Sequence, residues 1–399
     1  MAGGRFRRLF TKEQPPVVPV SHAALMQPIT EALKALIQKN GWQDSFQAAI
    51  EKAQSHDVHS IKGIRTLDDY LKWIDAFVAW APRERGDSRI IYNKLAEFYF
   101  FLDQEPLRSL QSPIRPGEGV QDLTPLSSWI TEYARTLGAY LDTTDSAQAV
   151  ESFRTNPLFN WNEYMPPPSG YFTFNQFFAR HVKPGMRPIA GLSDDRVLAS
   201  PADSTFVGRW QISERSKIYV EQDLLSIKGI EWSIHQLLTG SAYAERFRGG
   251  IFTHSFLNTF DYHRWHTPVR GTVLEARVIQ GQTFMDIRVK SAVVNGKTTN
   301  VLHALDGTGY QFVQTRGLVV LDSPVGLVAC LPMGMAQVSS VVITAEAGQT
   351  LHKGEELGYF QFGGSDFVMV FERASNVQLI CQPDVHYNQG TWIGNAYPQ

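Results

Sequence analysis

Residues 156–170 read NPLFNWNEYMPPPSG and divide the chain into two parts with different spacing of their hydrophobic residues. The prolines, asparagines and glycine of this stretch interrupt helices and favour extended or turning backbone. Residues before it show helical spacing, whereas residues after it form short β-rich runs. The sequence therefore predicts an α+β protein, with a helical N-terminal domain over residues 1–165 and a mainly β domain over residues 166–399.

The first part contains several amphipathic segments. Thr66 and Asp69 have the spacing of a capping box and open one of them, which closes before Pro82. Further segments with apolar residues at helical spacing are expected at residues 28–37, 90–102 and 129–141. The aromatic stripe of the last segment is typical of a helical core rather than of a cofactor site, so no chemistry is assigned to this part.

The second part is expected to consist of strands joined by tight turns. Apolar and β-branched runs predict strands near residues 250–253, 271–279, 318–321, 327–330 and 341–344. Repeated glycines over 348–358 indicate the turns of a small barrel or sandwich. The apolar stretch 317–338 is interrupted by Asp322, Pro324 and Pro332, and it predicts two buried strands rather than a membrane span.

Composition excludes several classes of protein. A hydrophobic content of 43% over 399 residues is enough for a large core, and a net charge of -2 argues against a nucleic-acid binder. Cys330 and Cys381 can form at most one bridge and match no metal-binding pattern, which favours a reducing, cytoplasmic location. The first ten residues carry three arginines and are expected to form a flexible basic tail rather than a secretory signal or transit peptide.

The densest group of chemically active side chains lies at 260–268, FDYHRWHTP, which contains His263 and His266. Their H-x-x-H spacing between β-like segments differs from the helical H-E-x-x-H of zinc hydrolases, so no metal site is predicted. Taken alone, the pair is compatible with a structural, a catalytic or a metal-binding role.

Two further residues complete a possible catalytic set. Ser365 follows two glycines in FGGSDFVMV, residues 362–370, and Asp203 ends the turn PAD at 201–203. Each alone is compatible with an ordinary loop or turn. Together, Asp203, His266 and Ser365 would supply the orienting acid, the base and the nucleophile of a hydroxyl-activating triad, which leaves His263 for a second step.

The order of these motifs resembles the pyruvoyl-dependent phosphatidylserine decarboxylase family. Its P-A-D element corresponds to 201–203, its D-Y-H-R-x-H-x-P element to 261–268 and its cleavage element to 363–365, and T-F-N-x-F-F-x-R is found at 173–180. The usual L-G-S-T is GGSD here, and Ser204 replaces a glycine. The G-G-S version and the front segment 25–29 look more like the branch that contains the fungal L-tryptophan decarboxylase of psilocybin biosynthesis.

This resemblance implies a cofactor made from the chain itself. Ser365 would attack the carbonyl of Gly364, with His266 as base and Asp203 orienting it, and would become a pyruvoyl group at the start of a fragment spanning 365–399. The protein would thus be a zymogen that matures by autocatalytic cleavage. His263 would handle substrate or return a proton. No motif singles out a Schiff-base lysine or a phosphate loop, so pyridoxal phosphate is not expected.

The expected function is therefore that of a soluble pyruvoyl-dependent carboxy-lyase. Its substrate would be an L-amino acid, with an aromatic, tryptophan-like side chain favoured, as in aromatic amine biosynthesis. A phosphatidylserine decarboxylase acting at a membrane surface and a non-catalytic binding protein on the same fold are the alternatives. The expected partners are the small-molecule substrate and the protein's own cleaved fragment. A homo-oligomer is allowed, and neither nucleic acid nor a transmembrane segment is expected.

Overall fold

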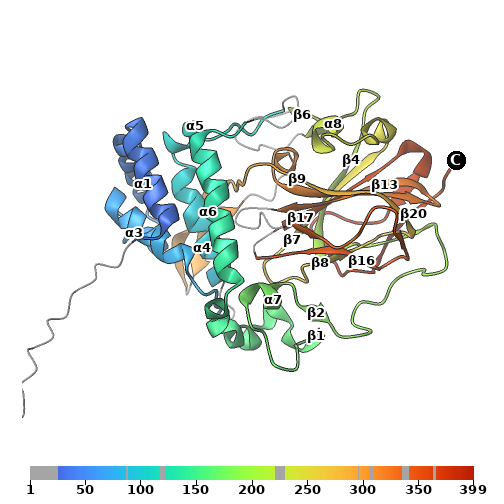
Figure 1. Ribbon diagram of the computed structural model, residues 1–399, viewed down its shortest axis with the longest axis horizontal. Helices are drawn as coiled ribbons and strands as arrows, with labels where there is room; N and C mark the ends of the chain where they lie inside the picture. The colour runs from blue at the N-terminus through green and yellow to red at the C-terminus, as the bar shows by residue number, and fades with distance from the viewer. Residues whose placement is uncertain are drawn as a thin grey trace, which may run out of the picture.

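The computed structural model describes residues 26–86, 89–116, 122–220, 230–294, 296–304, 309–334, 341–362 and 365–399. Helices fill the first part of the chain and lie together on one side of the molecule (Figure 1). The α-helices are α1 (Pro28–Asn40), α2 (Gln43–Ser55), α3 (Leu67–Val78), α4 (Ile90–Leu102), α5 (Leu107–Leu110) and α6 (Pro125–Leu141). Short 3-10 helices are η1 (His59–Ile61), η2 (Thr144–Thr155), η3 (Pro157–Phe159) and η4 (Trp161–Glu163).

Local sequence signals explain where these helices begin and end. The side chain of Thr66 accepts a hydrogen bond from the backbone N–H of Asp69, and Asp69 returns one to Thr66, so the expected capping box opens α3. In α1, Pro28 occupies the first turn, where its missing N–H costs nothing, and Gly41 ends the helix in the left-handed region at φ 66°. The predicted tail at the start of the chain lies outside the described residues.

The second part of the chain is mainly β. Its strands are β1 (Tyr164–Met165), β2 (His181–Val182), β3 (Val197–Ala199), β4 (Ser204–Gln211), β5 (Lys217–Val220), β6 (Ile230–Ser233), β7 (Ile251–Leu257), β8 (Arg264–His266), β9 (Gly271–Ile279), β10 (Ile287–Val294), β11 (Lys297–Ala304), β12 (Arg316–Ser323), β13 (Gly326–Gly334), β14 (Val341–Ile343), β15 (Thr350–Leu351), β16 (Glu356–Phe360), β17 (Ser365–Phe371), β18 (Val377–Leu379), β19 (His386–Tyr387) and β20 (Trp392–Ala396). Short helices are α7 (Phe174–Phe178), α8 (Ile234–Leu237), η5 (Ala244–Phe247), η6 (Tyr310–Phe312) and η7 (Arg373–Ser375). The predicted fold class, a helical part followed by a mainly β part, is confirmed.

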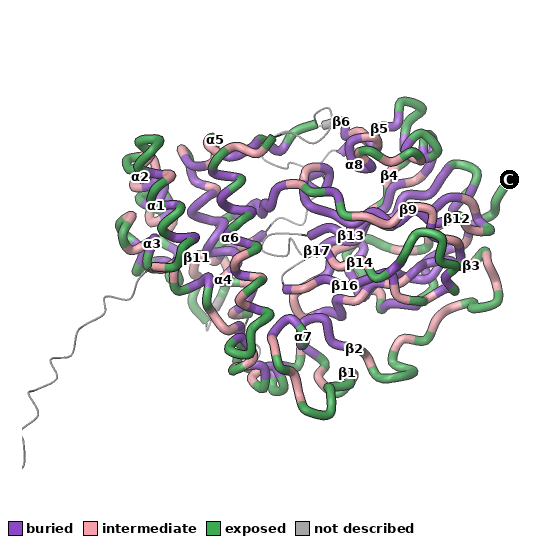
Figure 2. Tube along the Cα trace, viewed as in Figure 1, coloured by how far each residue is buried: buried purple, intermediate pink, exposed green. Residues whose placement is uncertain are grey.

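The largest sheet has eight strands in the order β15-β9-β12-β13-β17-β7-β4-β19, and every pairing in it is antiparallel. Its central strand β17 is buried along its whole length, and β13 along all but its first residue (Figure 2). Burial on both faces explains why these strands are apolar at consecutive rather than alternate positions. The two strands expected within 317–338 are β12 and β13, joined by a turn in which Ser323 pairs with Gly326; residues 335–338 of that stretch are not described.

One β-hairpin of the second part packs among the helices of the first. Strands β10 and β11 pair along their whole length, and both lie beside α4. The backbone N–H of Ile287 donates to Asp103 Oδ2 at 2.8 Å, and that of Ala304 donates to the Tyr92 hydroxyl at 2.7 Å. Asn300 Nδ2 donates to the carbonyl of His56 at 2.9 Å. The helical and β parts are therefore joined by hydrogen bonds, and the predicted domain division at 165/166 stays a prediction.

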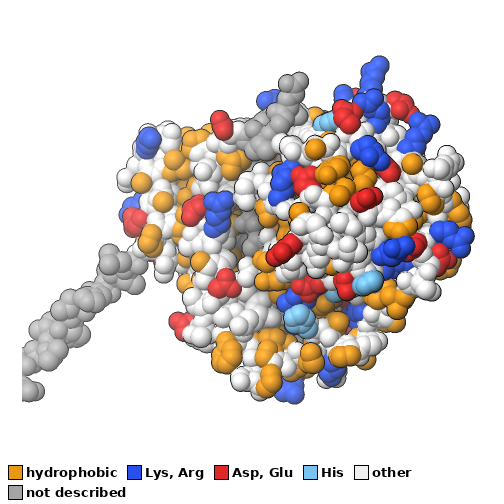
Figure 3. Space-filling view, turned by 45° about the vertical axis from the view of Figure 1, so that its right-hand side comes forward, with side chains coloured by type: hydrophobic (Ala, Val, Ile, Leu, Met, Phe, Trp, Pro, Cys, Tyr) orange, Lys and Arg blue, Asp and Glu red, His pale blue; other side chains and the backbone are white. Residues whose placement is uncertain are grey.

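The surface and the two cysteines add little chemistry. Acidic and basic side chains are intermixed on the face drawn in Figure 3, in keeping with the small net charge of -2. Within the described ranges, none of the helices has the length and apolar character needed to cross a bilayer. Cys330 is buried and Cys381 is half-buried, and both are free thiols.

Candidate active site

Ser365 is the first residue of β17, an interior strand of the large sheet. It pairs with Gly334 on β13 and with Leu257 on β7, and its side chain is completely buried. Neighbouring strands on both sides hold its backbone in place. The expected nucleophile therefore lies in the core of the β part, where the strand begins, although Gly363 and Gly364 themselves lie outside the described residues.

His263 is the histidine that faces Ser365. It precedes β8, is fully buried, and places Nδ1 3.5 Å from Ser365 Oγ. This distance is longer than a typical hydrogen bond, but catalytic contacts are often loose before reaction. The imidazole stacks on Phe178 with ring centroids 3.9 Å apart, and its Nε2 makes no hydrogen bond to any described residue. Burial, and then the positive charge of Arg180, keep the pKa of His263 well below its usual range.

His266, at the end of β8, makes different contacts. Its Nδ1 lies 2.9 Å from the carbonyl oxygen of Gly354, and its Nε2 lies 3.1 Å from the hydroxyl of Tyr262. A carbonyl only accepts, so Nδ1 carries the proton and Nε2 accepts from the Tyr262 hydroxyl. Burial lowers the pKa of His266. The ring is therefore a neutral base whose lone pair is occupied by a tyrosine hydroxyl.

Asp203 is buried and pairs with an arginine. Arg187 Nε and Nη2 donate to its two carboxylate oxygens at 2.8 and 2.6 Å, and the backbone N–H of Gln389 donates at 2.8 Å. Arg187 also binds Glu163 at 2.9 Å. Within the described part of the chain, neither an Asp203–His266 nor a His266–Ser365 hydrogen bond is present. The structure thus brings His263 to Ser365, and it places His266 and Asp203 with other partners.

Several residues near this site were not expected from the sequence. Asp261 is buried and lies 3.2 Å from His386 Nε2, a hydrogen bond that raises the pKa of His386. Arg180 is buried beneath the 260–261 turn and donates to the carbonyl of Phe260 at 2.8 Å. Phe178 covers His263. Arg180 and Phe178 belong to the F-F-x-R element that the sequence singled out, but their contacts with the histidine motif depend on tertiary packing.

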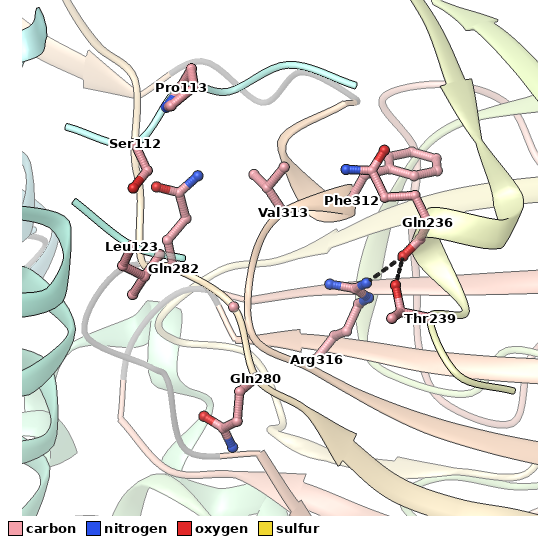
Figure 4. A pocket seen from close by; sticks show the side chains of 11 residues that line it. Ser112, Pro113, Leu123, Gln236, Thr239, Gln280, Gln282, Phe312, Val313 and Arg316 are labelled. Carbon is pink, nitrogen blue, oxygen red and sulfur yellow. Dashed lines mark hydrogen bonds between the residues drawn. The ribbon is translucent and has the colours of Figure 1, made fainter. Parts of the chain in front are cut away.

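A small cavity of about 40 Å³ lies away from Ser365 and is lined by Gln236, Gln282, Phe312 and Arg316, among other residues (Figure 4). The Arg316 guanidinium is buried and donates to the backbone carbonyls of Gln236, Leu237 and Gln314. Burial, followed by the charge of Arg277, lowers the pKa of Arg316 to about 9. This arginine holds the end of α8 in place, and the cavity contains none of the expected catalytic side chains.

Metal ligands are not gathered at any of these places. Among the residues that the structure describes, no three His, Cys, Asp or Glu side chains lie close enough to hold an ion together. The chemistry available at Ser365 is that of a buried hydroxyl beside a neutral imidazole.

The family model for phosphatidylserine decarboxylase matches residues 174–395 of the chain. The matched region includes every residue of the expected site. Among individual proteins, the phosphatidylserine decarboxylase proenzyme 3 of Schizosaccharomyces pombe is 34% identical over 59% of this chain. The decarboxylase iboD of Amanita muscaria is 31% identical over 64% of this chain and 77% of its own length.

Other relatives are matched over smaller shares of their length. The L-tryptophan decarboxylase of Psilocybe cyanescens is 26% identical over 56% of this chain and 51% of its own length. The match spans only 22% of the Schizosaccharomyces protein. The family model nevertheless covers more than half of the chain, and the resemblance inferred from the ordered motifs is confirmed: the chain belongs to the phosphatidylserine decarboxylase family.

Proposed function

We propose that this protein is a pyruvoyl-dependent amino-acid decarboxylase, a carboxy-lyase that matures by cutting its own chain between Gly364 and Ser365. The observation that carries the proposal is the buried Ser365 hydroxyl, 3.5 Å from the Nδ1 of a neutral His263, in a member of a decarboxylase family. A hydroxyl needs a base to become a nucleophile, and the burial of both groups excludes competing water.

The cleavage uses atoms of the chain alone, apart from one water molecule. Ser365 Oγ adds to the Gly364 carbonyl carbon, and the Gly364–Ser365 C–N bond breaks to leave an ester. Loss of the Ser365 Cα proton then breaks the Cβ–Oγ bond and frees the Gly364 carboxylate. Water then hydrolyses the C–N bond at the Cα of residue 365, so that the nitrogen leaves as ammonia and oxygen takes its place. The fragment 365–399 then begins with a ketone.

His266 is the proposed base for the first step, with Asp203 orienting it. Its neutral state supports this role, because a base must be able to accept a proton. However, Nε2 must first leave the Tyr262 hydroxyl, and Asp203 must turn from Arg187 toward the imidazole. His263 already faces Ser365 and needs no such rearrangement, so it is the competing candidate for the base.

His263 is proposed to act on the substrate after cleavage. Its buried Nε2 makes no hydrogen bond of ordinary geometry to the described residues, and the backbone of Asn258 and Thr259 interacts with the ring, so a substrate group could still supply a stronger partner. A pyruvoyl group at position 365 supplies the electrophilic carbonyl that serves as the electron sink for loss of carbon dioxide. Beside it, His263 would position the substrate or return a proton.

The favoured substrate is a free L-amino acid with a large aromatic side chain. The name of the Psilocybe relative, an L-tryptophan decarboxylase, supports this choice, whereas the Amanita relative is named only as a decarboxylase. Phosphatidylserine is the second candidate, because the family model and the Schizosaccharomyces relative are named for that activity. A binding protein without activity would keep the fold but would not cut its chain.

The test combines intact mass spectrometry with a product screen. We expect fragments 1–364 and 365–399, with residue 365 as pyruvoyl, and a single uncut chain for Ser365→Ala. Hydroxylamine should inactivate the cut protein by trapping its ketone. An uncut wild-type chain that is nevertheless active would overturn the mechanism. A higher kcat/KM for micellar phosphatidylserine than for tryptophan, phenylalanine and tyrosine would reject the favoured substrate and select the second.

A further inference from the structure

A second polar group lies directly behind the cleavage site. Asp366, the residue after Ser365, accepts hydrogen bonds at Oδ2 from the Tyr310 hydroxyl at 2.8 Å and from Gln311 Nε2 at 3.0 Å. Its Oδ1 lies 3.3 Å from His254 Nε2. All four side chains are buried. We call these four residues the Asp366 cluster, and the chemistry proposed for Ser365 does not use them.

The cluster lies on the opposite face of the sheet from the Ser365 hydroxyl. Side chains alternate along a strand, so Ser365 and Asp366 point to opposite faces of β17. His254 on β7 pairs with Val368 and therefore shares the face of Asp366. Strand β17 is thus held from one face by the cluster, while Ser365 meets His263 on the other.

The hydrogen bonds of the cluster fix the orientation of its amide. Gln311 Oε1 accepts from the backbone N–H of Gly309 at 2.7 Å, so Nε2 must be the atom that faces Asp366. That same Nε2 lies 3.1 Å from His254 Nε2. Donors from Tyr310 and Gln311 therefore converge on Oδ2 and orient the Asp366 side chain, whereas Oδ1 makes no hydrogen bond to a described residue.

We propose that Asp366 is a positioning residue for cleavage: Tyr310 and Gln311 anchor its carboxylate, and this anchor fixes the start of β17 so that Ser365 Oγ stays on the face of His263. The inference rests on the proposed self-cleavage. An attacking oxygen misplaced by about 1 Å can slow a reaction by about 100-fold. Terminal residues fray unless they are tied down, and cleavage turns residue 365 into a terminus, so the same anchor keeps it in place afterwards.

The test compares cleavage rates of freshly synthesised chains, followed by gel and by intact mass. We expect Asp366→Ala to slow cleavage at least tenfold, because both donors lose their acceptor. Asp366→Asn should cleave within about threefold of wild type, since its amide oxygen still accepts from Tyr310 and Gln311 while its N–H₂ faces His254. Tyr310→Phe should slow cleavage at least threefold, because one of the two donors is lost.

Val368→Ala is the matched control, because Val368 is buried on the same strand and the same face but makes no polar contact with its side chain. Melting temperatures of all the variants identify effects of general destabilisation. The inference is overturned if Asp366→Ala cleaves as fast as Val368→Ala at a similar melting temperature, or if Asp366→Asn is as slow as Asp366→Ala. A wild-type chain that stays uncut would instead contradict the proposed self-cleavage. Failure of the Asp366 proposal can therefore be distinguished from failure of the proposed function.

Discussion

The surroundings of His263 hold its imidazole in the neutral form. Burial and the charge of Arg180 keep its pKa well below the usual range, whereas the same side chain in an unfolded chain has a pKa of about 6.5. Below about pH 6.5 the unfolded state therefore binds more protons than the folded state, and stability falls as the pH falls. At neutral pH the same property leaves His263 able to accept a proton.

This titration can be measured in the Ser365→Ala chain, which should stay uncut. The unfolding free energy of this chain should decrease between about pH 7 and pH 5. We predict that adding His263→Leu makes this decrease smaller by about 2 kcal/mol. Urea unfolding at both pH values measures the difference. His386→Leu is the control of opposite sign, because the bond with Asp261 raises the pKa of His386 and stabilises its charged form at low pH. An acid loss unchanged by His263→Leu would show that His263 takes up its proton over the same pH range in the folded and unfolded states, which contradicts a lowered pKa.

The two histidines should separate in their effects on maturation and turnover. His266→Ala is expected to block cleavage, and Asp203→Ala to slow it strongly, if His266 is the base. His263→Ala should still cleave at least in part and then turn over poorly. Gels and decarboxylation assays on each variant decide the assignment. Wild-type cleavage in His266→Ala together with none in His263→Ala would transfer the role of base to the histidine that faces Ser365.

Tyr262 offers a sharper probe of the same question. Its hydroxyl occupies the Nε2 lone pair of His266, so Tyr262→Phe frees that lone pair without removing the ring. We predict cleavage at the wild-type rate or faster if His266 is the base. Tyr310→Phe, which also removes one buried tyrosine hydroxyl, is the control and should slow cleavage. A Tyr262→Phe chain that fails to mature would indicate that the hydroxyl itself takes part.

Local signals in the sequence are sufficient to predict a helix or strand wherever the segment carries its own pattern. The capping box at Thr66 and the apolar spacing of 90–102 predict α3 and α4, and the run 271–279 coincides with β9. Helix α2 was not predicted. The position of β10 and β11 among the helices could not be predicted either, because it depends on contacts between residues far apart in the sequence.

The same limit applies to the site. The candidate residues can be identified from the sequence, because the motifs that contain them and the order of those motifs can be read directly from it. The sequence does not supply their partners: the Arg187–Asp203 pair and the Tyr262–His266 bond join residues whose contact only the fold creates. Asp366 departs from the usual motif, and its hydrogen bonds with Tyr310 and Gln311 give that departure a physical meaning.

The short helix α7 lies at the front of the β part and ends beside His263. The side chain of Thr173 caps it by accepting from the N–H of Gln176 at 3.1 Å, and Phe178 at its end stacks on His263. We predict that Phe178→Leu lowers stability by about 1–2 kcal/mol and lowers kcat about tenfold in the matured protein, because the imidazole loses the ring that orients it.

Phe153→Leu is the control for Phe178→Leu. Phe153 is a buried ring that packs on Phe174 and Phe177 of the same helix but is not among the ring contacts of His263. Thermal unfolding should show a similar loss for both variants, whereas only Phe178→Leu should lower kcat. Equal effects on kcat would mean that α7 acts through general packing rather than through His263.

The β10–β11 hairpin joins the helical part to the β part. Hydrogen bonds from Ile287, Asn300 and Ala304 reach Asp103, His56 and Tyr92. Tyr310 and Gln311, which hold Asp366, follow this hairpin in the chain. If the chain is cut at Ser365 as proposed, the helices would help to hold the part of the chain that anchors the start of β17.

The helical part and the β part are expected to unfold as one cooperative unit. Tyr92→Phe leaves the backbone N–H of Ala304 without its acceptor, at a cost of about 1–3 kcal/mol. Because the hairpin packs on the helices and continues into the β part, we expect this loss to lower the unfolding free energy of both parts together. Hydrogen exchange followed by mass spectrometry on peptides from α6 and β12 reports each part separately. Tyr219→Phe, at an exposed position on β5, should change neither. A loss of protection in α6 with β12 unchanged would mean that the helical part unfolds independently, as two separate domains at 165/166 would.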